Sequence, residues 1–326
     1  MTAPEEPGPA LERAILGEDV AYNALEVAEA TGAGIEETRR LWRALGFPDR
    51  GSERAFTQAD ADAVSTLLGL VDDGSIDFDM AVNLTRAVGQ TMARLADWQV
   101  ATLLQRVQQL EAGDDATGSR ATTALQMVET LNRPFEELLL YVWRRHLAAA
   151  VGRVEALGAS EEDLHTSQVT VGFADIVSFT ALTNQLDHDR IGDLVEIFES
   201  RCADVVAGCG GRVIKSIGDA VLFVNEEPIR AYDTAEGIIT VVGRDPRMPD
   251  VRVGLSTGMV VMRLGDVFGP PVNLASRLTA VARRNRIIVD QATADLLPDD
   301  QFEARPLPER PVRGFGVVAP VAVRRH

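Results

Sequence analysis

Two aspartates occupy positions from which they could bind a divalent cation. Asp175 stands near the end of the apolar run 169–180, VTVGFADIVSFT, which is typical of a strand that turns into a helix. Asp219 follows Gly218 between two β-branched runs, and this pattern predicts a β-hairpin with Gly218 and Asp219 at its tip. Strand-end aspartates often cap helices, and Gly-Asp is common in tight turns. Together, however, the two carboxylates could hold two metal ions on a triphosphate.

Lys215 is the only lysine of the chain. The other 31 basic residues are arginines, so a position that keeps an ammonium indicates a site that requires lysine, because the two cations differ in shape and hydration. A further segment, 265–278, places Asn273 and Arg277 four residues apart where a helix is expected to begin, so both point to one face. An amide and a guanidinium could hold a ribose oxygen and neutralise charge on a reacting phosphate, although this spacing also occurs by chance.

The elements that must position these residues lie in the second half of the chain. After Thr166, short β-branched runs alternate with amphipathic stretches, which predicts an α+β domain over 166–326. Residues 1–157 instead show apolar residues at three- and four-residue spacing, which predicts an all-α domain, and 158–165 is expected to be the linker. The helices expected in the first domain include 35–45, 58–72, 78–111, 121–131 and 135–157.

Two local signals refine these helices. Gly89 is a candidate kink within 78–111. Asn132, followed by Pro134, is expected to cap the long helix 135–157, with Pro134 in its first turn. This helix leads directly into the second domain, so it could transmit a movement or act as a passive spacer.

Composition and charge limit the class of protein. A hydrophobic fraction of 46% in 326 residues supports packed cores, and the net charge is −17. Residues 1–165 carry 14 Arg and 28 Asp and Glu, so most of the negative charge lies in the first half. This excess of negative charge argues against broad binding to nucleic acid or anionic membranes.

No apolar stretch reaches the ~20 residues of a membrane helix, and the acidic start is unlike a signal peptide, so we expect a cytoplasmic protein. Cys202 and Cys209 are expected to be reduced thiols.

The motifs of the second domain resemble those of the class III adenylyl cyclase catalytic domain. The resemblance rests on the segments FADIVSFT at 173–180, KSIGD at 215–219 and the stretch 266–277, in this order and with suitable spacing, and it covers almost all of 166–326. It implies a ferredoxin-like fold with a βαββαβ core. It also implies conversion of ATP into 3′,5′-cyclic AMP and pyrophosphate, with two divalent cations, Mg²⁺ or Mn²⁺, as cofactors.

The same resemblance implies roles near the two aspartates. Asp175 and Asp219 match the metal-binding pair of the family, and Ile176 would add a backbone carbonyl. Phe179 and Thr180 lie where backbone N–H groups would meet the phosphates.

Further positions match the family's nucleotide-binding and catalytic residues. Lys215 and Asp266 match the pair that selects adenine over guanine; guanylyl cyclases of the family typically carry Glu and a small residue there. The chemistry agrees, because Lys can donate to adenine N1 and Asp can accept from the N6 amino group, whereas guanine presents the opposite pattern. Asn273 matches the ribose-orienting residue and Arg277 the transition-state arginine.

Two more arginines are candidates for phosphate binding. Arg313 stands in the segment VRGFG, where the family often has Lys, and Arg252 is a weaker candidate. The resemblance further implies that the active site forms between two copies of the chain, with the metal aspartates from one protomer and Lys215, Asp266 and the helix residues from the other.

The first domain allows two interpretations. The segment 24–45, with Gly32 and Gly34 at the turn, resembles the helix-turn-helix of MerR-type regulators. It could bind DNA, which would make the chain a nucleotide-sensing transcriptional regulator, or it could be a helical scaffold without that function. The whole arrangement resembles soluble actinobacterial cyclases in which a helical domain restrains the catalytic dimer, and some of these respond to pH or to fatty acids. Here His146 and His165 are candidates for pH sensing, and a lipid or other small molecule is a candidate effector.

Overall fold

A computed structural model describes residues 7–114, 116–156, 166–184, 186–263 and 265–326. The chain divides into two compact units, Met1–Gly152 and Arg153–His326. The expected linker 158–165 lies outside the described residues. Among the helices that the structure describes, none combines the length and the apolar character needed to cross a lipid bilayer.

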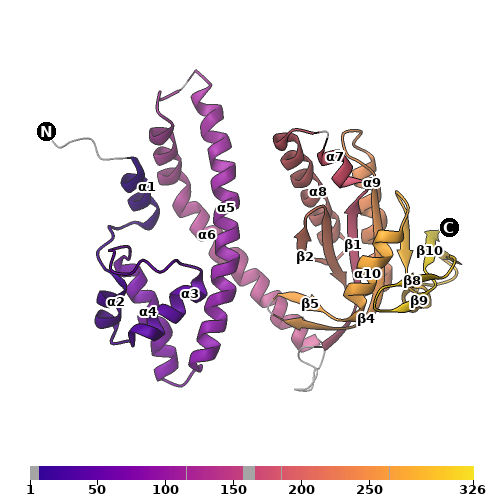
Figure 1. Ribbon diagram of the computed structural model, residues 1–326, viewed down its shortest axis with the longest axis horizontal. Helices are drawn as coiled ribbons and strands as arrows, with labels where there is room; N and C mark the ends of the chain where they lie inside the picture. Colours follow the sequence, from indigo (N-terminus) through magenta and orange to yellow (C-terminus); the bar gives the residue numbers. More distant parts are fainter. Residues whose placement is uncertain (1–6, 115, 157–165, 185, 264) are drawn as a thin grey trace. The chain divides into compact units, whose positions relative to one another are not determined.

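The first unit is entirely helical in its described part apart from an isolated bridge between Tyr22 and Phe56. Figure 1 shows α2, α3 and α4 gathered at one end of the long α5. The helices are α1 (Pro7–Leu16), α2 (Ala24–Thr31), α3 (Ile35–Leu45), α4 (Gln58–Asp72), α5 (Phe78–Glu111) and α6 (Arg120–Ala156). The expected bounds of α3, α4 and α5 are confirmed, and local capping explains why. Thr57 and Asp60, for example, form a capping box at the start of α4.

The second helix of the expected helix-turn-helix contributes both to the core of this unit and to ion pairs on its surface. Trp42 on α3 is buried and stacks on Phe56, with 4.0 Å between the ring centroids. The arginines of α3 are engaged by acidic side chains, since Arg39 pairs with Glu36 and Arg40 pairs with Asp79, each at 3.0 Å. Trp42 therefore belongs to the core of this unit, and DNA binding by this helix stays a prediction.

Helix α5 runs unbroken through Gly89, where a side chain would clash with the backbone of Leu45, so this glycine allows a close contact between α3 and α5. One expectation about the long helices needs correction. Helix α6 continues through Pro134 instead of restarting after Asn132. The Asn132 side chain donates to the carbonyl of Ile15 at 3.2 Å, so this tertiary bond replaces the expected cap.

The second unit has a ferredoxin-like core. The core elements are β1 (Thr166–Ile176), α8 (His188–Gly208), β2 (Arg212–Ile217), β3 (Ala220–Asn225), α9 (Pro228–Gly243) and β4 (Val251–Arg263). Their strands lie side by side in the order β2-β3-β1-β4, all antiparallel. This is the arrangement that the βαββαβ pattern predicts. The remaining elements are α7 (Phe179–Thr183), β5 (Asp266–Phe268), α10 (Pro270–Val281), β6 (Ile287–Val289), α11 (Gln291–Ala294), β7 (Phe302–Pro306), β8 (Arg310–Val312), β9 (Gly316–Val318) and β10 (Val321–Arg325).

The strands of the core alternate between two packed faces. On β1, Ala174 and Ile176 pack with α8 and α9, whereas Val171 and Phe173 pack with Ala275 of α10 on the other face. Side chains two apart on a strand share a face, so Asp175 projects on the side of α10. The alternation therefore directs this carboxylate toward the helix that carries Asn273 and Arg277.

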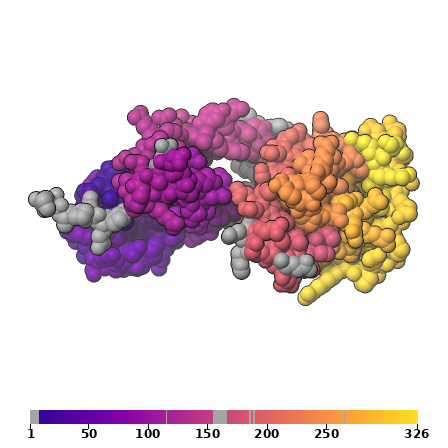
Figure 2. Space-filling model, turned by 90° about the horizontal axis from the view of Figure 1, so that it is seen from above, coloured from indigo at the N-terminus to yellow at the C-terminus, as the bar shows by residue number. Residues whose placement is uncertain are grey.

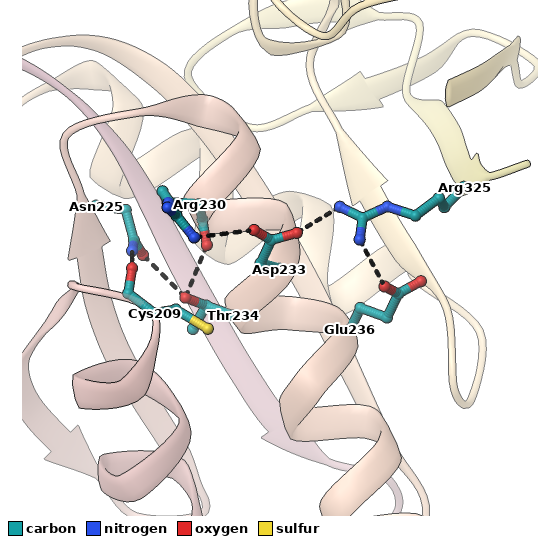
Figure 3. A network of polar contacts seen from close by, with 7 residues as sticks. All are labelled: Cys209, Asn225, Arg230, Asp233, Thr234, Glu236 and Arg325. Carbon is teal, nitrogen blue, oxygen red and sulfur yellow. Dashed lines mark hydrogen bonds and ion pairs between the residues drawn. The ribbon is translucent and has the colours of Figure 1, made fainter. Parts of the chain in front are cut away.

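Arg325 of the last strand, β10, binds α9 through ion pairs and lies beside two aromatic rings. The Arg325 guanidinium pairs with Asp233 and, at 3.7 Å, with Glu236 (Figure 3). It also lies 5.6 Å from the ring centroid of Tyr232 and 5.1 Å from that of Phe302. In the space-filling view, β7 to β10 form the yellow edge of this unit (Figure 2). These contacts hold the C-terminal edge of the sheet against the core.

A second polar link joins α9 to the hairpin that carries Asp219. The Thr234 hydroxyl donates to the Asn225 side chain at 3.3 Å, and the Asn225 amide donates to the Cys209 carbonyl at 3.3 Å (Figure 3). Asn225 is buried and ends β3. These two hydrogen bonds therefore connect the two ends of the segment 209–225, which contains β2 and β3, to each other and to α9.

Helix α10 packs directly on the backbone of β4 at Gly254. A Cβ atom at this position would lie 2.4 Å from the Thr279 nitrogen and 2.5 Å from the Ala275 carbonyl oxygen. We expect Gly254→Ala to lower the free energy of unfolding by about 2–3 kcal/mol, because the helix must move away from the strand. Urea unfolding measures this effect. Gly192→Ala is the control: this exposed position of α8 has open space, so it should gain about 0.5–1 kcal/mol.

Candidate active site

The structure brings Asp175 and Asp219 together at the end of β1. The register between β1 and β3 pairs Asp175 with Ala220, the residue after Asp219. The Ile176 nitrogen donates to the Asp219 carbonyl at 3.1 Å, so the hairpin tip is bound to the strand end. Two residues 44 positions apart in the sequence thus form one acidic site.

The surroundings of Asp175 raise the pKa of its carboxyl group. Burial is the largest cause, the Asp219 carboxylate adds to it, and the Arg252 guanidinium acts in the opposite direction. The side chain of Asp175 is only 15% exposed. A half-shielded carboxylate beside a second carboxylate fits a divalent cation, because such an ion favours the charged form of both groups and prefers oxygen ligands. Within the described ranges, no group of three or more His, Cys, Asp and Glu side chains surrounds this pair.

Lys215 and Asp266 are in direct contact. Their side chains form an ion pair between β2 and the first residue of β5, and they are 37% and 26% exposed. The Val267 nitrogen donates to the other oxygen of Asp266 at 2.8 Å and so orients the carboxylate. The structure thus places an ammonium donor and a carboxylate acceptor side by side at a surface that remains accessible.

A pocket of about 400 Å³ lies between the sheet and α10. Asp175, Lys215 and Asn273 line it, together with Ser276, which sequence reasoning missed. The only signal for Ser276 is its place three residues after Asn273, on the same helix face. The remaining lining residues are mostly apolar: Phe173, Ile217, Ala220, Leu222, Val267, Val272, Thr279 and Ala280. An apolar pocket with a few polar groups is the usual form of a ligand site.

Arg277 lies outside this pocket within a single chain. Its side chain is exposed on α10, and in the part of the chain that the structure describes it makes no hydrogen bond or ion pair. Arg252 is engaged by Asp175, with 2.7 Å from Nε to Oδ2. Arg313 is exposed in the turn between β8 and β9, which form a separate two-stranded sheet.

The turn from β1 into α7 carries Phe179 and Thr180. Phe179 packs partly against the core, and Thr180 is exposed. Ser178, the N-cap residue, has φ 60° and ψ 31°, a left-handed conformation uncommon for serine. This sharp turn leaves the first backbone N–H groups of α7 without acceptors within the helix.

The two histidines considered for pH sensing are separated from this site in the sequence. His146 is exposed on α6 and has no hydrogen bond or ion pair among the described residues. His165 lies outside the described residues.

Comparison with known proteins decides the family. A family described as the adenylate and guanylate cyclase catalytic domain matches residues 162–323, and the adenylate cyclase regulatory domain matches residues 6–148. An adenylate cyclase of Streptomyces coelicolor is 38% identical over 97% of this chain and 89% of its own length. The chain belongs to the class III adenylate cyclases.

Other matches differ in how much of this class III cyclase they cover. A pH-sensitive adenylate cyclase of Mycobacterium tuberculosis is 32% identical over 96% of this chain and 81% of its own length. The solved structure of the adenylyl cyclase CyaB from P. aeruginosa covers 49% of this chain and 94% of its own, at 22% identity and a TM-score of 0.44. The full-length matches include the helical unit, which agrees with a regulatory domain preceding the catalytic domain.

Proposed function

We propose that this class III cyclase converts ATP into 3′,5′-cyclic AMP and pyrophosphate. The observation that carries the proposal is the contact between Lys215 and Asp266, which places a donor and an acceptor side by side at an accessible surface. In this proposal the ribose 3′-hydroxyl loses its proton to water and its oxygen forms a bond to the α-phosphorus, while the bond from that phosphorus to the pyrophosphate oxygen breaks and pyrophosphate leaves.

Adenine recognition follows from the charges of the Lys215–Asp266 pair. The ammonium donates to adenine N1 and the carboxylate accepts from the N6 amino group. Guanine carries a hydrogen at N1 and an acceptor at O6, so it would place a donor against the ammonium and an acceptor against the carboxylate. This pair therefore favours ATP over GTP.

We assign the acidic site to two divalent cations, Mg²⁺ or Mn²⁺. Asp175 and Asp219 would hold them, with the Ile176 carbonyl as a further ligand. When bound, such cations lower the pKa of a hydroxyl and neutralise a triphosphate. Asn273 would orient the ribose, and the exposed Arg277 would stabilise the charge that develops on the phosphate in the transition state.

The triphosphate would be held by groups around this site. The backbone N–H groups of Phe179 and Thr180 open a helix, and among the described residues they have no acceptor, so they could donate to phosphate oxygens. Arg313 and Arg252 are further candidates; Arg252 would have to leave Asp175 first.

A homodimer completes the proposed site. Within one chain Arg277 is exposed and does not line the pocket, whereas the reaction needs it at the phosphate. We propose that one protomer supplies Asp175 and Asp219, and that its partner supplies Lys215, Asp266, Asn273 and Arg277, so that a two-fold axis generates two equivalent sites.

The proposed activity is tested by product analysis of the wild type and of a variant at Lys215, the residue assigned to the selection of ATP over GTP. Purified protein incubated with Mn²⁺ and ATP should form cyclic AMP, whereas GTP should give little cyclic GMP. Lys215→Glu should lower kcat/KM for ATP by roughly a hundredfold, because one charge-assisted hydrogen bond of about 1.5–3 kcal/mol is lost and a repulsion is added. Ser216→Ala, at the exposed neighbouring position, should leave kcat/KM unchanged. Equal rates with ATP and GTP in the wild type would reject the assigned selectivity.

The helical unit is assigned to control of the catalytic unit, in line with the regulatory-domain match. One relative is described as pH-sensitive, and this proposal includes a response of the activity to pH or to a lipid, with His146 and His165 as the candidates for pH sensing.

A double variant, His146→Ala with His165→Ala, should show a flattened pH profile of activity. An unaltered profile would remove both histidines from consideration.

Because ATP is held inside cells, we place the enzyme in the cytoplasm.

A further inference from the structure

We propose that Arg252 is an internal counter-ion that occupies the cation position at Asp175 in the free enzyme and competes with the divalent ion for it. This inference rests on the proposed function, because it concerns the same acidic site. Asp175 Oδ2 accepts from Arg252 Nε at 2.7 Å and lies 2.6 Å from Nη2. Both donors therefore approach a single oxygen of the carboxylate.

The sheet places the two residues against each other. In the register between β1 and β4, Asp175 is directly opposite Arg252. Their side chains are 15% and 27% exposed, so water screens the pair only in part. A cation that binds either oxygen of Asp175 in this setting meets the positive charge of the guanidinium, and this repulsion weakens the binding of the metal.

In the free enzyme, a positive charge beside Asp175 is electrostatically favourable. Asp175 is partly buried and lies close to the Asp219 carboxylate, and both conditions disfavour its charge. Without a cation, two adjacent carboxylates would destabilise the end of β1 and the hairpin tip. Arg252 supplies a positive charge there until a divalent ion arrives.

Arg252 also has a second hydrogen-bond partner, which would remain after a divalent ion displaces the guanidinium from Asp175. Its Nη1 donates to the Ala280 carbonyl at 3.0 Å. Ala280 lies in the last turn of α10, where carbonyls lack intrahelical partners and a cation is favoured by the helix dipole. The guanidinium can therefore release Asp175 without losing every contact, which lowers the cost of the exchange. The same contact links a metal aspartate to the helix that carries Asn273 and Arg277.

Binding of Mn²⁺ to the full-length, nucleotide-free protein tests the counter-ion role without any turnover. The electron paramagnetic resonance signal of free Mn²⁺ at pH 8 reports the Kd. Arg252→Gln keeps a polar side chain and removes the charge, so it should bind Mn²⁺ at least about tenfold more tightly than wild type. Arg252→Lys keeps the charge but cannot contact both Asp175 and Ala280, so it should bind about threefold more tightly.

The matched control is Arg247→Gln, which removes the same charge from an exposed arginine paired with Asp245 at 2.8 Å. It should leave the Kd for Mn²⁺ unchanged. Thermal unfolding checks that each variant is folded, and Arg252→Lys carries the test if Arg252→Gln does not fold.

The direction in which the Kd for Mn²⁺ changes in the Arg252 variants decides whether the proposal holds. An arginine that only orients Asp175 would weaken metal binding when it is removed, so an unchanged or higher Kd in the Arg252 variants overturns the proposal. The absence of measurable binding in both wild type and variants overturns it as well. The proposed function is judged separately: wild type that forms no cyclic AMP rejects the cyclase activity, whereas normal cyclic AMP formation with an unchanged Kd in the variants rejects only the counter-ion role.

Discussion

Purified Asp219→Ala protein is expected to form cyclic AMP at least about a thousandfold more slowly than wild type. Asp219 lies at the hairpin tip, bound through its carbonyl to Ile176, and supplies one of the two carboxylates of the proposed cation site. Loss of roughly 4 kcal/mol of transition-state stabilisation corresponds to this factor. Initial rates of cyclic AMP formation at saturating Mn²⁺ and ATP measure it.

One further variant separates charge from shape at this position, and a control variant removes a carboxylate elsewhere. Asp219→Asn retains the size of the side chain and should be nearly as inactive, because a neutral amide is a poor ligand for a hard cation. Asp204→Ala removes a carboxylate from an exposed position of α8 that has no ion pair in the described part of the chain, and it should retain full activity. An Asp219→Ala protein as active as wild type would refute the metal assignment.

Mixing two inactive variants should restore activity. Arg277→Ala alone is expected to lower the rate by a factor of about 10²–10³, because the cation that meets transition-state charge is missing. In a heterodimer of Asp219→Ala and Arg277→Ala, one site carries both substitutions and the other carries neither. Random exchange makes half of the dimers mixed, and each has one intact site of two, so about a quarter of wild-type activity should return.

Co-expression of the two differently tagged variants, followed by purification through both tags, allows a direct measurement. The doubly purified heterodimer should reach about half of the wild-type rate. If all site residues instead came from one protomer, every chain would carry one lesion, and the mixture would stay as inactive as its parents. This result would overturn the dimeric site while leaving the cyclase chemistry in place.

Local sequence patterns predicted several elements correctly because those elements are determined by neighbouring residues. Asp77 caps α5 through the Met80 nitrogen at 2.7 Å, and Thr57 with Asp60 caps α4, so both starts are readable from the chain. Gly218 has φ 63°, the conformation that the predicted hairpin tip requires. The restart of a helix after Asn132 was wrong, since α6 runs through Pro134 and the Asn132 side chain instead donates to the carbonyl of Ile15, 117 positions away.

By itself, the sequence determined which functional residue types the chain carries, the family, and the alternating pattern of the strands that directs Asp175 toward α10. Only the tertiary structure decided which of these side chains meet. Lys215 contacts Asp266 across 51 positions, and Asp175 contacts Arg252 across 77. Such contacts depend on strand register, and a shift of one residue would send each side chain to the opposite face of the sheet. The register therefore makes Arg252, which stays a candidate for phosphate binding, the partner of Asp175 in the free chain.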